Sequence, residues 1–272
     1  MDPHAIGRTL PLWSVLPFAG LLFGIALVPL ASPVFWSRHF GKISFAFGAP
    51  VATYFVFADP HELLHTALEY VSFIILLGSL FTISGGILLK GTLRGRPAVN
   101  CAFLGVGAVI ANLLGTTGAS MLLIRPLMRA NAHRKEKAHV FVFFIFVVAN
   151  VGGCLTPIGD PPLFLGYLKG VPFFWTLANL WHFWLLANVL IIGIFFLLDR
   201  RALRAEESRG RGIEEAVGEP APLRLEGQWN FLLLLAVIGA VFVPTPWRES
   251  AMLVASAISV WRTPKRIREE NG

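Results

Sequence analysis

The chain has 272 residues, of which 55% are hydrophobic and only 14% are charged, and its mean hydropathy is +0.67. Soluble globular proteins carry about 25% charged residues, so this composition excludes an ordinary soluble domain and predicts an all-α, polytopic membrane protein. The net charge of +7 comes from short Lys and Arg clusters between long apolar runs. Because such clusters orient membrane helices, they predict membrane lipid and no nucleic acid as a partner.

Apolar runs of about 17–25 residues predict the membrane spans. The first run is kept as a span, because its leader is only weakly basic for a signal peptide. In chain order the runs are Leu12–Leu30, Ile43–Ala58, Thr66–Leu89, Ala138–Leu168, Phe173–Leu198 and Trp229–Val243, followed by a short apolar piece at Ala251–Trp261.

The residues before the third run, His61-Glu62-Leu63-Leu64-His65, match the H-E-x-x-H pattern of zinc proteases. In that pattern two imidazoles one helical turn apart hold the metal, and the carboxylate acts on metal-bound water. The competing interpretation is a polar helix start, in which Asp59 caps the helix and Pro60 occupies its first turn. The positive-inside rule places this segment outside the membrane, without a third ligand. We therefore favour the helix start and expect no enzyme, with an intramembrane zinc metalloprotease as the alternative.

The run Ala98–Met128 is too long for one straight span. At 1.5 Å per residue it would be about 46 Å long, whereas the hydrocarbon core is about 30 Å thick. Its middle, Asn112–Ser120, is polar and glycine-rich. The basic clusters Lys90–Arg96 and Arg129–Lys137 are both cytoplasmic only if the run enters and leaves on one side. The run is therefore predicted to be a re-entrant hairpin, with the N-terminus outside and the C-terminus in the cytoplasm.

A second interruption, "ANVGGCLTPIGDPPLF" at Ala149–Phe164, breaks the span Ala138–Leu168. No continuous helix tolerates so many glycines and prolines, so a broken transmembrane helix is predicted. Its unwound backbone must be buried in protein or line a wet cavity, so we expect the hairpin tip, Asn112–Thr117, to lie close to Gly152–Asp160. The alternative is a pair of ordinary kinks with small-residue packing.

Both breaks combine Asn, Gly and Thr, as Ala111-Asn112-x-x-Gly115-Thr116 and as Ala149-Asn150-x-x-Gly153 followed by Thr156. Half-helix ends, carbonyls and hydroxyls at mid-depth are how secondary transporters hold ions and anionic substrates. Asp160 is predicted to couple the ion, because an acid in an intramembrane break is by default functional. The alternative role for its carboxylate is to cap the following half-helix.

The two motifs, "ANLLGTTGAS" and "ANVGGCLTPIGDPPL", resemble the ion-transporter superfamily, which includes citrate and dicarboxylate transporters, arsenite permeases and D-type sodium/proton antiporters. The second motif is most similar to the antiporter and citrate-transporter branches. The resemblance implies a sodium site where hairpin tip and broken helix meet. The residues implied to bind ion or substrate are Asn112, Gly115, Thr116, Thr117, Asn150, Gly153, Thr156, Pro157, Gly159 and Asp160, with sodium held by Asn112, Thr116, Asn150, Thr156 and Asp160.

Two departures leave the substrate and the coupling ion open. The hairpin tip lacks the Ser-Asn-Thr of the dicarboxylate branch, and Ala111 stands where many antiporter relatives carry Asp. The family also uses two inverted repeats, each with one hairpin and one broken helix. We therefore predict an N-terminal repeat at residues 1–198, a cytoplasmic linker at 199–228 and the truncated start of a second repeat at 229–272.

The leading hypothesis is a secondary active transporter, multi-pass in the inner (plasma) membrane. It couples sodium or proton movement to antiport, or to symport of a carboxylate such as citrate. We expect no cofactor apart from a sodium ion, and the partner that binds is a small inorganic cation, with or without a carboxylate. As the N-terminal half of a transporter, the chain is expected to work as a homodimer or with a C-terminal half; a non-transporting partner subunit is a further alternative.

Overall fold

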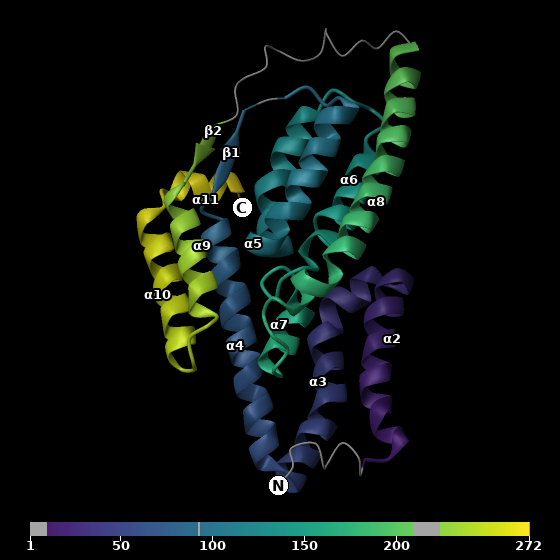
Figure 1. The fold of residues 1–272 in the computed structure, drawn as a ribbon. Coiled ribbons are helices and arrows are strands. Elements are labelled where there is room, and N and C mark those ends of the chain that lie inside the picture. Colours follow the sequence, from purple (N-terminus) through teal and green to yellow (C-terminus); the bar gives the residue numbers. More distant parts are fainter. Residues whose placement is uncertain (1–9, 92, 209–223, 272) are drawn as a thin grey trace. The chain divides into compact units, whose positions relative to one another are not determined.

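The computed structural model describes residues 10–91, 93–208 and 224–271, which are mainly helical (Figure 1). The strands in this part of the chain are β1 (Leu88–Lys90) and β2 (Arg224–Glu226), which pair antiparallel. The all-α, polytopic class is confirmed, because five helices are long and apolar enough to cross a membrane. These are Leu12–Ala31, Pro33–Ala58, Pro60–Ser84, Pro97–Ala130 and Trp175–Ser208.

The chain divides into two compact units, residues 1–70 and 71–272. The first contains η1 (Leu12–Val15), α2 (Leu16–Ala31), α3 (Pro33–Ala58) and the beginning of α4 (Pro60–Ser84). The predicted start of the second span at Ile43 was too late, since α3 begins at Pro33 and includes Arg38 and Lys42. The hydropathy pattern stopped at these two cations, but Arg and Lys are good helix formers and do not end a helix.

The H-E-x-x-H segment forms the first turns of α4. Asp59 Oδ1 accepts a hydrogen bond from the backbone N–H of Glu62 at 3.0 Å, and Pro60 is the first helical residue, so the helix-start interpretation is confirmed. Within the described residues no group of three or more His, Cys, Asp or Glu side chains gathers to hold a metal ion. α4 also ends earlier than predicted, at Ser84 rather than Leu89, because a Gly85-Gly86 turn leads into β1.

The predicted hairpin is confirmed by α5 (Pro97–Ala130), whose two arms lie side by side (Figure 1). Asn100 and Asn131 exchange two side-chain hydrogen bonds of 3.1 and 2.8 Å. In one straight helix these residues would be about 46 Å apart. The reversal occurs at Gly115, the one residue inside α5 with non-helical backbone angles. The beginning and the end of α5 therefore lie close together, opposite the tip of the hairpin at Gly115.

The predicted broken span is also confirmed. It consists of α6 (Ala138–Val147), η2 (Val151–Gly153) and α7 (Pro161–Leu168), with irregular backbone between them. α8 (Trp175–Ser208) continues beyond the predicted span end at Leu198, so the first part of the predicted linker is helical and the part from 209 to 223 lies outside the described residues.

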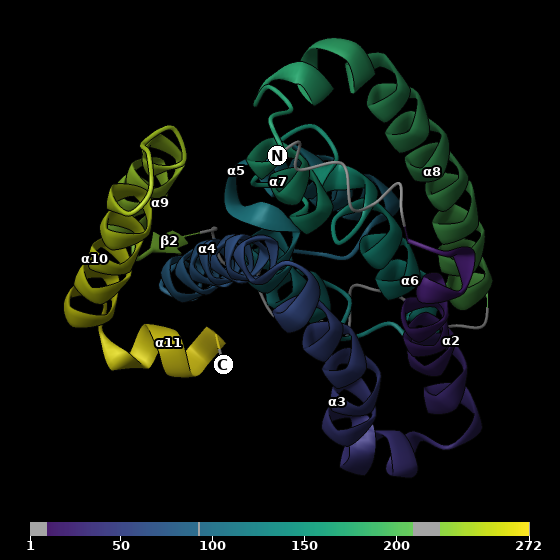
Figure 2. The same ribbon diagram turned by 90° about the horizontal axis from the view of Figure 1, so that it is seen from below.

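The C-terminal region forms α9 (Trp229–Ala240), α10 (Trp247–Arg262) and α11 (Lys265–Asn271) (Figure 2). Asn271 Nδ2 donates to the carbonyls of Gly85 and Ile87 at 3.0 and 2.6 Å, which fixes α11 to the end of α4. The predicted boundaries of the two repeats are not tested by this arrangement and stay a prediction.

A buried polar cluster holds the two ends of the hairpin against α6 and α8. Asp199 on α8 accepts a hydrogen bond from Asn100 at 2.9 Å, pairs with the Arg134 guanidinium, and has Oδ1 2.8 Å from His139 Nε2. The side chains of Arg134 and Asp199 are fully buried. Glu206 accepts the backbone N–H groups of residues 135 and 136 at 3.0 and 2.8 Å. His133 lies in the loop between α5 and α6. Burial lowers the pKa of its imidazole, and the positive charge of the neighbouring Arg134 lowers it further.

Candidate functional site

The tip of the hairpin depends on Gly115. Its φ of +75° lies in the region that side chains other than glycine adopt at a cost, and its backbone is buried. A Cβ added there would lie 3.2 Å from the carbonyl oxygen of Ile158, which belongs to the broken span. Glycine at this position therefore permits both the reversal of the chain and the close approach of the second break.

The two breaks satisfy each other's backbone groups. Asn112 Nδ2 donates to the Gly152 carbonyl at 2.7 Å, and its Oδ1 accepts the N–H of Leu155 at 2.9 Å. Thr156 Oγ1 donates to the Asn112 carbonyl at 2.6 Å, and the N–H of Thr116 donates to the Gly159 carbonyl at 3.1 Å. Unpaired backbone groups cost several kcal/mol in hydrocarbon, so this pairing meets the condition for irregular backbone inside a membrane. The predicted contact between hairpin tip and broken span is confirmed.

Gly153 and Gly159 bring two backbone segments of the broken span against each other. A Cβ on Gly153 would lie 2.4 Å from the Gly159 carbonyl oxygen, and one on Gly159 would lie 2.1 Å from that of Gly153. Both contacts are with backbone rather than with a flexible side chain, so an added methyl group displaces the loop. The geometry requires glycine at both positions.

Gly153→Ala and Gly159→Ala are each expected to lower the free energy of unfolding by about 1–3 kcal/mol, the usual cost of overpacking a closely packed site. Gly193→Ala in α8 is the matched control, because nothing lies within 4 Å of the Cβ it adds. Thermal unfolding of the three detergent-purified variants measures the effect. Unchanged stability of both loop variants would show that the close approach does not require glycine.

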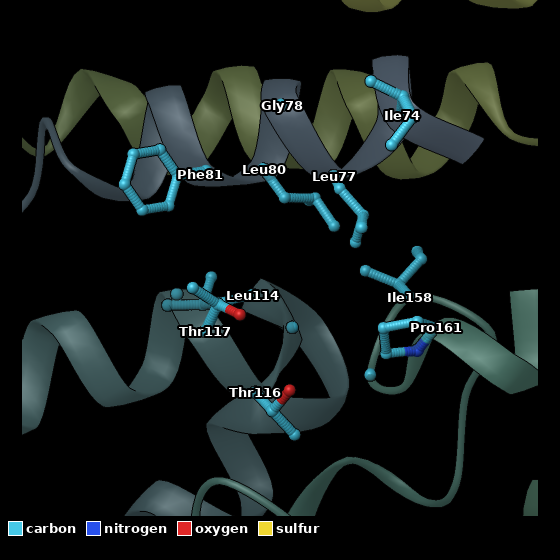
Figure 3. A pocket seen from close by; sticks show the side chains of 13 residues that line it. Ile74, Leu77, Gly78, Leu80, Phe81, Leu114, Thr116, Thr117, Ile158 and Pro161 are labelled. Carbon is cyan, nitrogen blue, oxygen red and sulfur yellow. The ribbon is translucent and has the colours of Figure 1, made fainter. Parts of the chain in front are cut away.

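A cavity of about 360 Å³, here called the tip cavity, lies between the hairpin tip, the broken span and α4 (Figure 3). On α4 the spacing i, i+3, i+4, i+7 places Ile74, Leu77, Gly78 and Phe81 on one wall. No residue that lines the tip cavity carries a charge. The full lining consists of Ile74, Leu77, Gly78, Leu80, Phe81, Leu114, Gly115, Thr116, Thr117, Gly118, Ile158, Gly159 and Pro161.

The polar side chains of the tip cavity are two hydroxyls. Thr116 and Thr117 line it from the start of the second hairpin arm, and Figure 3 shows both opposite the apolar wall of α4. Among the described residues neither hydroxyl forms a hydrogen bond. Threonine oxygens without internal partners are available to a cation or to a substrate carboxylate.

Asp160 stands between two residues that line the tip cavity, Gly159 and Pro161. It occupies the N-cap position of α7, but its side chain makes no capping hydrogen bond, so the capping alternative is wrong for this structure. Pro161 and Pro162 lack N–H groups, which removes the nearest donors. Among the described residues, the partly buried carboxylate forms no hydrogen bond or ion pair.

The structure sorts the predicted site residues into groups. Lining the tip cavity are Gly115, Thr116, Thr117 and Gly159, while Asn112, Gly153 and Thr156 brace the loops behind it. Pro157 is buried in the broken span, and Asp160 lies beside the lining. Asn150 is not brought to the cavity: its side chain is exposed and its Nδ2 donates to the Ile145 carbonyl at 2.9 Å.

Two residues of α8 that sequence reasoning missed also hold the broken span. Trp184 Nε1 donates to the Gly152 carbonyl at 2.9 Å, and Thr176 Oγ1 donates to the Leu155 carbonyl at 2.8 Å. Nothing in the local sequence distinguishes Trp184 from the neighbouring tryptophans of α8. The apolar wall on α4 was missed for the same reason, because its residues have the spacing of any membrane helix.

Comparison with known proteins gives a family and no individual relative. No curated protein and no solved structure matches this chain. A family model described as "Putative citrate transport" matches residues 7–272, which is nearly the whole chain and includes both breaks and the tip cavity. The chain is therefore a multi-pass membrane protein that belongs to the putative citrate transport family.

Proposed function

We propose that the chain is part of a secondary active transporter that moves a carboxylate such as citrate together with sodium ions or protons. The observation that carries this proposal is the interlocked pair of helix breaks beside the tip cavity, where Asp160 stands between two lining residues and its carboxylate has no hydrogen-bond partner among the described residues. Broken helices of this kind form the substrate and ion sites of secondary transporters. Membership of the family supports a transporter and a carboxylate substrate.

One helix end at the tip cavity favours an anionic substrate. The second hairpin arm begins at Thr116, which lines the cavity. The N-terminus of a helix carries a partial positive charge, so this end provides a favourable potential for a carboxylate. The Thr116 and Thr117 hydroxyls are donors that a carboxylate oxygen accepts.

Asp160 favours a coupled cation. A carboxylate with no partner at membrane depth is costly unless it binds a cation or a proton. Sodium bound there would also offset part of the negative charge of a neighbouring carboxylate substrate. Substrate and ion would then bind more tightly together than separately, which is the coupling that symport requires.

The second candidate is sodium/proton antiport, and the lining of the tip cavity is the specific observation in its favour. No lining residue is cationic, whereas a citrate trianion is usually bound with Arg or Lys groups. We further propose that a second hairpin and broken helix, from a second copy or from a C-terminal half, complete the transport path. In this proposal the basic clusters at 90–96 and 129–137 face the cytoplasm of the inner membrane.

The experiment is substrate-resolved flux in proteoliposomes that hold the purified chain, alone and with a supplied C-terminal half. Labelled citrate and smaller dicarboxylates are offered under an inward sodium gradient, under an inward proton gradient and under no gradient. We expect at least one carboxylate to accumulate about tenfold or more above the level without a gradient.

Empty liposomes and liposomes holding Asp160→Asn are the controls. Sodium-driven proton movement without carboxylate uptake would select the antiport candidate. Absence of any gradient-driven flux, with and without the C-terminal half, would contradict both candidates. The remaining hypothesis would then be that the chain is a non-transporting partner subunit.

A further inference from the structure

A second cavity, of about 620 Å³, lies far along the chain from the tip cavity and is here called the interface pocket. It is lined by residues of β2, the start of α9, the end of α10 and α11. Its lining consists of Leu225, Glu226, Gly227, Gln228, Trp229, Asn230, Leu232, Leu233, Ile258, Arg262, Thr263, Pro264 and Ile267. We propose that this pocket binds an anionic phospholipid.

The two halves of the pocket differ in polarity. Leu232 on α9 and Ile258 on α10 are 56% and 38% exposed, so the helix side is apolar and open. At the other end Trp229 begins α9 and Arg262 ends α10, next to the polar strand β2. An indole and an arginine beside an apolar helix surface mark the boundary between hydrocarbon and headgroups. A ligand that fits both halves has a charged head and an apolar chain.

The charge of the pocket favours an anionic head. Arg262 packs with its guanidinium carbon 5.5 Å from the centre of the Trp229 ring, and no carboxylate among the described residues pairs with it. The acid in the lining, Glu226, is already engaged, at 2.7 Å from Arg266 and 3.6 Å from Lys90. The guanidinium is therefore the free charge of the pocket, and its fork geometry suits phosphate oxygens.

The polar floor of the pocket is held together by its own hydrogen bonds. Asn230, only 2% exposed, donates through Nδ2 to the Gly86 carbonyl at 2.9 Å and to Thr263 Oγ1 at 3.0 Å, and its Oδ1 accepts from Ser259 at 2.5 Å. Gly227 has φ of +78°, and a Cβ on it would meet the Gly86 carbonyl oxygen at 1.9 Å. The Asn230 side chain on the floor thus has its hydrogen bonds satisfied by the protein, and Arg262 over the Trp229 ring is the polar group left to a ligand.

Lipid is favoured over a soluble phosphate because of the open apolar half. A free anion would leave Leu232 and Ile258 facing an aqueous cavity, whereas an acyl chain covers them at about 0.8 kcal/mol for each buried CH₂. Basic pockets at the ends of membrane helices are known to take anionic headgroups. The proposal does not depend on the transport function, since it rests on the lining of this pocket alone.

The test measures lipid binding to the purified chain in detergent by native mass spectrometry. Phosphatidylglycerol and phosphatidylcholine of the same chain length are titrated against wild type, Arg262→Gln and Arg201→Gln. Arg201 is an exposed arginine on α8 outside the pocket, so its variant controls for loss of one surface charge. We expect phosphatidylglycerol to bind wild type and Arg201→Gln about tenfold more tightly than phosphatidylcholine, and Arg262→Gln to lose this preference.

A competition arm separates lipid from soluble phosphate, with glycerol 1-phosphate as the probe. We expect it not to displace phosphatidylglycerol when the two are present at equal concentrations. Displacement would reassign the pocket to a soluble anion. Equal binding of the two lipids by wild type, or an unchanged preference in Arg262→Gln, would overturn the proposal.

Discussion

Asp199→Asn is expected to lower the free energy of unfolding by about 3–5 kcal/mol, the usual cost of removing one partner of a buried ion pair. The fully buried Arg134 guanidinium would keep its charge and retain only Glu206, whose Oε2 lies 3.7 Å from Arg134 Nε, as a counter-charge. The same carboxylate receives a hydrogen bond from Asn100 and contacts His139, so both ends of the hairpin region lose an anchor. Thermal unfolding of the detergent-purified chain should show a midpoint lower by roughly 10 °C.

The double variant Asp199→Asn with Arg134→Met distinguishes a lost ion pair from general damage. Replacing both charges of a buried pair is often close to neutral, but Arg134 also pairs with Glu206 at 3.7 Å, so the second change should recover only part of the lost stability. The exposed Arg201→Gln is expected to stay within about 0.5 kcal/mol of wild type. If Arg134→Met made the Asp199→Asn protein still less stable, the pair would not be the source of the effect.

Asp160→Asn is expected to abolish ion-coupled uptake while leaving insertion and folding intact. A unit charge 4 Å from a bound cation contributes about 4 kcal/mol at an effective dielectric constant of 20, so cation affinity should fall by at least about 100-fold. Because the carboxylate caps no helix and forms no ion pair among the described residues, its loss should cost little stability. The measurement is the sodium and pH dependence of initial uptake rates in proteoliposomes.

Asp160→Glu is the matched variant, since it keeps the charge and shifts it by one methylene. It should retain measurable ion dependence with a weaker apparent affinity. Equal ion dependence in wild type and Asp160→Asn would remove Asp160 from the coupling mechanism. Loss of folded protein in the Asn variant, seen by size-exclusion chromatography, would instead assign the residue a structural role.

The sequence was sufficient for the parts of the fold that the membrane itself constrains. The length of Ala98–Met128 and the basic clusters on either side predicted the hairpin, and the Gly/Pro density predicted the broken span. Their contact followed from the need to pair backbone groups away from water, and the bonds between Asn112, Leu155 and Thr156 confirm it.

Contacts between segments distant in the chain could not be predicted. Asp199 was placed at the start of a cytoplasmic linker, because a charged residue after an apolar run normally ends a span. In the folded chain α8 continues to Ser208, and partners on α5, the following loop and α6 bury the carboxylate. Likewise, the spacing of Ile74, Leu77 and Phe81 shows one helix face but not that a cavity lies in front of it.

Cysteine labelling at the tip cavity tests most directly whether it is the transport site. Thr117→Cys, in a chain with Cys101 and Cys154 replaced by Ser, places a thiol at an exposed position in the lining. Ala132→Cys, exposed in the loop after α5, is the control. We predict that a water-soluble maleimide labels both, and that saturating transported carboxylate with its coupling ion slows labelling at position 117 about fivefold or more and leaves position 132 unchanged. A labelling rate at position 117 that no transported substrate or ion alters would contradict the assignment of the tip cavity as the transport site.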